Sequence, residues 1–146
     1  MLGQRIIVTS WVTVAIFAVV AIPDAIGLRA LDTAAVIVAV VFFLGSLPIW
    51  VFAYFAALAR TTRGDNITVS GLFFLTDSAP KPVQRQLLGA LGASIVLAAA
   101  TAFANPFGVL VPMLPLGFAG LWGARHGVYP PRPTRPAPVK KTGGRR

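Results

Sequence analysis

Four long stretches of this chain are apolar and contain no charged residue: 6–22, 33–59, 87–104 and 107–124. A helix needs about 20 mostly apolar residues to cross the hydrocarbon core of a bilayer. Each stretch comes close to this length, and the second is long enough to span with tilt. The sequence therefore predicts an all-α fold, namely a polytopic membrane protein with four transmembrane helices.

The composition agrees with this prediction. Hydrophobic residues make up 56% of the 146 positions and charged residues only 12%, whereas soluble domains are about 25% charged. A soluble domain of this size buries too little of its surface to hide so many apolar side chains. The lack of cysteine excludes a disulfide-stapled secreted domain, and the apolar composition excludes a disordered chain.

The first apolar stretch has an alternative explanation as a cleavable signal peptide, because the positively charged Arg5 precedes it. The stretch is longer than the usual apolar core of a signal peptide, and no clear small-x-small cleavage site follows it. We therefore predict an uncleaved helix over 6–22. Pro23 is expected to end this helix, because proline lacks the backbone N–H that a continuing helix needs.

Only Asn105 and Pro106 separate the third stretch from the fourth, so these two helices are predicted to form a tight helical hairpin. The fourth stretch contains Pro112 and Pro115, which disturb a helix. Proline is tolerated in membrane helices where neighbouring groups satisfy the freed backbone. A kinked span is therefore favoured over a re-entrant loop.

The distribution of basic residues predicts the orientation, because cytoplasmic loops carry an excess of Lys and Arg. With four spans, Arg5, the loop 60–86 and the region after residue 124 share one side and hold twelve of the 13 basic residues. Arg29 lies on the other side. Both termini are therefore expected in the cytoplasm. Frequent Ala, Val and Gly, more Arg than Lys, and no Glu are typical of a GC-rich bacterial genome, so the expected location is a bacterial plasma membrane.

Four aromatic residues lie near the predicted cytoplasmic ends of the second and fourth helices: Trp50, Tyr54, Trp122 and Tyr129. Trp and Tyr are enriched where membrane helices meet the headgroups, so these residues are candidates for an aromatic belt. For Trp50, packing within the protein is an equally good explanation.

The chain divides into a four-helix transmembrane domain, 1–128, and a tail, 129–146, that is rich in Pro, Arg and Lys. Dense proline favours extended polyproline II and opposes helix and sheet, so the tail is expected to be disordered. Basic side chains near a membrane are attracted to anionic lipid headgroups. The tail residues that are candidates for this contact are Arg132, Arg135, Lys140, Lys141, Arg145 and Arg146. No nucleic acid partner is expected, because no aromatic residue follows Tyr129 to stack on bases.

The loop 60–86 contains an apolar run, 71–75, that is unusual for a cytoplasmic loop. Three explanations remain open from the sequence. The run dips into the headgroup interface, packs beneath the helix bundle, or forms a docking surface for a partner.

Few side chains are available for chemistry. The chain has no Cys, no Glu and a single histidine, His126. Asp24 and Asp32 fall in one predicted loop, and Asp65 and Asp77 fall in another on the opposite side. A metal site needs several such ligands together. We therefore expect no catalytic residues, no metal, no cofactor and no enzymatic activity.

Small residues repeat at helical spacing in the last two spans. Ala90, Ser94, Ala98 and Ala102 recur every four residues, and Gly117, Gly120 and Gly123 recur every three. Small residues let membrane helices approach closely, so both sets are candidate helix-packing faces. They serve either the bundle itself or contacts with a second membrane protein.

Two functional hypotheses follow. The first is an accessory or assembly subunit of a bacterial plasma-membrane complex, with membrane lipids and other membrane proteins, or a second copy, as partners. The alternative is a small transporter or pore that acts as a homo-oligomer. A proton-coupled transporter is disfavoured, because no predicted span contains an ionisable residue.

Overall fold

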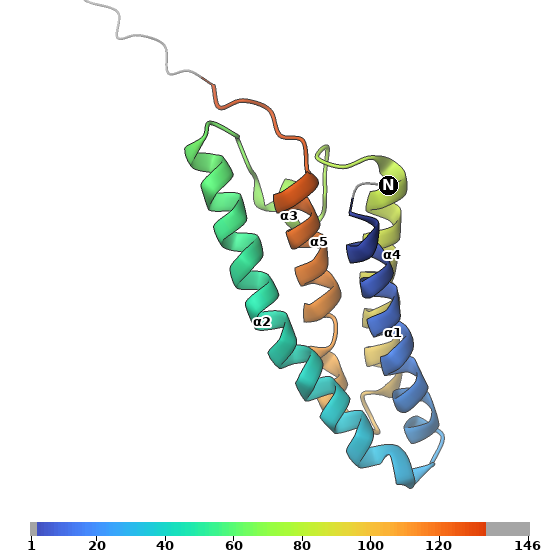
Figure 1. Ribbon diagram of the computed structural model, residues 1–146. Coiled ribbons are helices and arrows are strands. Elements are labelled where there is room, and N and C mark those ends of the chain that lie inside the picture. The colour runs from blue at the N-terminus through green and yellow to red at the C-terminus, as the bar shows by residue number, and fades with distance from the viewer. Residues whose placement is uncertain (1–2, 134–146) are drawn as a thin grey trace, which may run out of the picture.

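The computed structural model describes residues 3–133, which form a bundle of four long helices (Figure 1). These helices are α1 (Gln4–Ala25), α2 (Asp32–Thr62), α4 (Lys81–Thr101) and α5 (Met113–His126). Shorter helical elements lie between them: η1 (Arg29–Leu31), α3 (Val69–Phe73) and η2 (Pro106–Leu110). Within the described residues there is no strand, only an isolated bridge between Asp65 and Pro131.

Four helical segments are long and apolar enough to cross a membrane: Gln4–Ala25, Arg29–Thr62, Lys81–Thr101 and Pro106–His126. The prediction of an all-α chain with four such helices is confirmed. The N-terminus, the end of α2, the start of α4 and the end of α5 lie together at one end of the bundle (Figure 1). We call this the basic end, because every described Lys and Arg except Arg29 belongs to the segments that meet there.

Helix α1 extends past the predicted stop at Pro23 and ends at Ala25. Proline removes only one backbone hydrogen bond, and its φ angle fits a helix. The real stop is Gly27, whose φ of 101° reverses the chain. The backbone N–H groups of Gly27 and Leu28 then bond the carbonyls of Asp24 and Pro23, at 3.0 Å each, as in a Schellman motif.

Helix α2 is the longest and includes Pro48 in its interior. It ends in the same manner as α1. Gly64 has a φ of 104°, and the N–H of Asp65 bonds the Arg60 carbonyl at 3.2 Å. Gly27 and Gly64 therefore end the first two long helices. Each adopts a positive φ, which glycine reaches more easily than residues with a Cβ atom.

Helix α4 begins with Lys81 and Pro82 in its first turn, which suits proline because that turn has free N–H groups. Neither Asp77 nor Ser78, which precede this helix, caps its N-terminus. The capping position is Pro80, without a side-chain hydrogen bond. Ser78 instead donates its hydroxyl to the carbonyl of Gly71.

The fourth span has two parts. After α4, Asn105 accepts a hydrogen bond from the Phe107 N–H at 3.1 Å and starts the 3-10 helix η2. Pro112 then precedes α5, and Pro115 lies in its first turn, where its missing N–H costs least. Helix α5 alone has 14 residues and a length of about 21 Å, so η2 completes the distance across a bilayer.

Helix α5 has the largest buried share of the four spans, and α2 has the smallest. Helix α5 contacts α1, α2, α3 and α4. Such close approach from several sides requires small side chains, and the sequence of α5 supplies three glycines and two alanines. The fourth span is therefore the centre of the bundle, and α2 lies at its periphery.

Candidate functional site

The apolar run 71–75 packs within the basic end of the bundle. Leu72 lies in a small cluster with Ala57 of α2 and Ala124 of α5. The Phe73 ring stacks on Trp50, with 4.5 Å between ring centroids. Of the three explanations left open by the sequence, packing against the bundle is the one that the structure shows. Phe74 alone among these residues is exposed.

Leu75 anchors the same run on the other side of α5. It is fully buried with residues of α1, α4 and α5: Ile7, Val83, Leu87, Ala119 and Trp122. Its φ of 56° places a non-glycine residue in the left-handed region, where Cβ crowds the backbone. Burial of the leucine side chain offsets this strain. The run 71–75 therefore closes the basic end of the bundle with the protein's own side chains.

Arg60, in the last turn of α2, joins three segments at this end. Its Nε donates to an Asp65 carboxylate oxygen at 2.7 Å. Its Nη1 donates to the carbonyls of Ala124 at 3.3 Å and Gly127 at 2.8 Å. The last carbonyls of a helix lack intrahelical partners and carry partial negative charge, so a guanidinium satisfies both needs there.

The chain after α5 continues along this junction. The N–H of Val128 donates to the Ser78 carbonyl at 2.8 Å, and that of Arg132 donates to the Gly64 carbonyl at 2.8 Å. The N–H of Asn66 donates to the Pro130 carbonyl at 2.9 Å. Residues 129–132, at the start of the predicted disordered tail, are thus held against the loop by backbone pairing.

The tail from residue 134 onward lies outside the described residues. This includes five of the six candidate lipid-contact residues: Arg135, Lys140, Lys141, Arg145 and Arg146. Arg132 is described, and it is exposed. Its guanidinium lies 3.5 Å from the Thr61 carbonyl.

Tyr129 is the aromatic member of the junction. The guanidinium of Arg60 lies 5.0 Å from the centre of its ring, in a cation–π arrangement. Its hydroxyl donates to the Gly71 carbonyl at 3.2 Å. Burial raises the pKa of this hydroxyl, while the hydrogen bond with Ser78 and the charge of Arg60 oppose the rise. The phenol is therefore neutral near pH 7 and acts as a donor.

The other aromatic candidates divide between packing and surface. Trp50 donates its Nε1–H to the Met113 carbonyl at 2.9 Å. This contact agrees with packing within the protein, one of the two explanations considered for Trp50. Trp122 is 2% exposed. Tyr54 is exposed on the outside of α2.

The two candidate packing faces lie inside the described bundle. Ala90, Ser94 and Ala98 are buried, whereas Ala102 follows the end of α4 and is partly exposed. A Cβ added at Gly117 would lie 3.1 Å from the Trp50 ring, and one at Gly120 would collide with Phe73. At Gly123 an added Cβ would collide with the Leu72 carbonyl oxygen. The glycines thus form the surface on which α2 and the run 71–75 pack.

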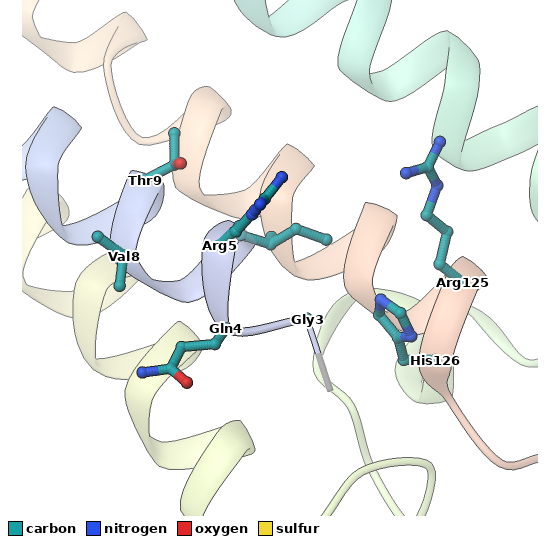
Figure 2. Close-up of a pocket in the computed structure, with 8 residues that line it drawn as sticks. Gly3, Gln4, Arg5, Val8, Thr9, Arg125 and His126 are labelled. Atoms are coloured by element: carbon teal, nitrogen blue, oxygen red, sulfur yellow. The ribbon is translucent and has the colours of Figure 1, made fainter. Parts of the chain in front are cut away.

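A second feature of the basic end is an open groove between the start of α1 and the end of α5, with a volume of about 830 Å³. Figure 2 shows Arg5 of α1 and Arg125 of α5 on opposite sides of this space, with His126 beside Gly3. The sequence does not predict that these two arginines line one groove, because 120 positions separate them. The excess of basic residues at helix ends was the available signal.

Asp24 departs from its predicted position in a loop. It lies in α1 and is 9% exposed, and its Oδ2 has no hydrogen-bond partner within residues 3–133. The cause is the extension of α1 through Pro23. The candidate spans, as the structure bounds them, contain ionisable residues near their ends, and Asp24 is the buried carboxylate among these.

Within residues 3–133 no group of three or more His, Cys, Asp or Glu residues lies together as metal ligands would. In the same range the only salt bridge is that between Arg60 and Asp65. No protein-family model, curated protein or solved structure matches the chain. Its function is therefore inferred from the geometry alone.

Proposed function

We propose that this protein is a multi-pass membrane subunit without catalytic machinery, with an accessory or assembly role in a bacterial plasma-membrane complex. The observation that supports this role is the closure of the bundle by its own side chains. The run 71–75 fills the basic end, and the small-residue faces of α4 and α5 are buried within the chain. Because the chain's own side chains fill the interior of the bundle, another subunit would bind to its outer surface.

Helix α2 offers the largest such outer surface. It contributes 31 residues, of which five are buried. Its exposed large apolar residues are Ile37, Val41, Leu44, Leu47, Val51, Phe52, Tyr54, Phe55 and Leu58. Aromatic side chains contribute strongly to interfaces because they bury a large area at little conformational cost. The aromatic half of α2 is therefore the surface proposed to contact another subunit.

Site-specific photo-crosslinking in intact membranes tests this docking. A benzoylphenylalanine at Phe52, which is 65% exposed, is expected to form adducts with another membrane protein. The same probe at Phe103, which is 78% exposed beyond the end of α4, serves as a control and is expected to give none. Equal protein adducts at both positions, or lipid adducts alone at both, would contradict the proposed surface.

The proposed topology places both termini and the loop 60–86 in the cytoplasm, with α4 and α5 as a helical hairpin. Because the native chain lacks cysteine, single-cysteine variants report each side cleanly. Leu28→Cys, in the exposed loop after α1, is expected to react with an impermeant maleimide in intact cells. Arg63→Cys, exposed at the basic end, is expected to react only after permeabilisation. The reverse pattern would overturn the orientation.

The alternative function, a small transporter or pore formed by a homo-oligomer, is favoured by one observation. Asp24 is a buried carboxylate within a candidate span, and such residues often mark ion or proton pathways. Substrate or ion flux in liposomes that contain only this chain, abolished by Asp24→Asn, would support this alternative over the accessory role.

A further inference from the structure

The groove between α1 and α5 carries positive charge that the protein does not neutralise. Arg5 and Arg125 are both exposed, and neither guanidinium makes a hydrogen bond or ion pair within residues 3–133. Of the two aspartates at the basic end, Asp65 is paired with Arg60, and Asp77 makes no ion pair with either arginine within residues 3–133. The groove is therefore a site of unpaired positive charge.

The backbone adds to this charge. Helix α1 begins at Gln4 with no side-chain cap and no acidic residue in its first turn. The first N–H groups of a helix lack intrahelical partners and carry partial positive charge. At the end of α5 the carbonyls of Ala124 and Gly127 are already bonded by Arg60. These carbonyls therefore do not occupy the guanidinium of Arg125, which has no ion-pair partner within residues 3–133 and can bind an external anion.

The walls of the groove change character along α1. Arg5 and Gln4 line its polar part, and Val8 and Thr9 line the next turn, toward the middle of the span. Val8 is 52% exposed. A groove lined by Arg5 and Arg125 at one level and by Val8 one turn deeper on α1 fits a molecule with an anionic head and a hydrocarbon chain.

We propose that this groove binds one anionic phospholipid, with its phosphate between Arg5 and Arg125 and His126 beside it. Guanidinium groups suit a phosphate because their N–H donors match its oxygens in pairs. The acyl chains would follow the apolar surface of α1 below Val8. The proposal depends on α1 and α5 as membrane spans and is independent of the partner proposed for α2.

Native mass spectrometry of the full-length, delipidated protein tests the site. Phosphatidylglycerol is titrated against phosphatidylcholine in a neutral detergent. The wild type is expected to retain one phosphatidylglycerol with about tenfold or greater preference over phosphatidylcholine. The variant Arg5→Gln with Arg125→Gln is expected to lose this preference.

The matched control is Arg63→Gln with Arg85→Gln, which removes the same charge from exposed positions outside the groove. It is expected to keep the wild-type preference. Equal losses in the two double variants would reveal bulk electrostatics and overturn the site. Displacement of the lipid by inorganic phosphate at the same concentration would indicate a site for soluble anions and would also overturn it.

A second measurement covers the case in which the double variant does not fold. A photoactivatable phosphatidylglycerol analogue with its reactive group near the phosphate is crosslinked to wild-type protein, and the modified peptides are mapped. Adducts are expected in residues 3–9 and 121–126. Adducts confined to other segments would contradict the proposal.

Discussion

Replacing Gly123 by alanine is expected to destabilise the protein by about 2–3 kcal/mol. The added methyl group would collide with the Leu72 carbonyl oxygen and would lie 3.1 Å from the Tyr129 hydroxyl. A backbone oxygen cannot move aside as the end of a flexible side chain can. Either α3 moves away from α5 or the contact between Leu72, Ala57 and Ala124 opens.

The matched control is Gly92→Ala in α4, where an added Cβ meets no atom within 4 Å. This change is expected to be neutral or to stabilise the helix by about 0.5–1 kcal/mol, because alanine has the better helix propensity. The thermal-unfolding midpoint of each purified variant in the same detergent is the measurement. Gly123→Ala with a midpoint at or above that of Gly92→Ala would contradict the close packing of α3 on α5.

The second large effect is expected at Arg60. Arg60→Ala removes the ion pair with Asp65 and the cation–π contact with the Tyr129 ring. It also removes two hydrogen bonds, one to a carbonyl in the last turn of α5 and one to a carbonyl just after that helix. The side chains of the ion pair are 25% and 31% exposed, so solvent weakens that interaction. The carbonyls left without a donor add most of the cost, and the total is expected to be about 2–4 kcal/mol.

Hydrogen exchange distinguishes this local effect from general instability. In Arg60→Ala, the amides of Asn66 and Arg132 are expected to lose protection, because Arg60 holds the two segments that they join. Arg63→Ala is the control, since Arg63 is exposed one turn later and has no side-chain partner within residues 3–133. Indistinguishable exchange at these amides in both variants would show that Arg60 does not hold the junction.

The four spans were predictable because hydropathy over about 20 residues is a local property of the chain. The same local reading placed the end of α1 incorrectly at Pro23. Helix termination depends on how the last carbonyls find partners, and here the positive φ of Gly27 provides them. This error also moved Asp24 from the helix into a loop and hid a buried carboxylate.

The candidate sites were less predictable than the spans. The glycine spacing of α5 predicted a packing face but not its occupants, which are Trp50, Phe73 and the Leu72 backbone. The junction at Arg60 joins residues that are 64 and 67 positions apart. Periodicity within one segment contains no information about such contacts, because the partner lies on another segment.

The sequence by itself determined the number of spans, the helical class of the chain and the concentration of basic residues at one end. These follow from the cost of exposing polar backbone and charge to hydrocarbon, which acts on each segment separately. The tertiary structure alone decided that 71–75 closes the bundle, that residues 129–132 pair with the loop, and that Arg5 and Arg125 share a groove. Those features depend on the packing of several helices around α5, which no single segment specifies.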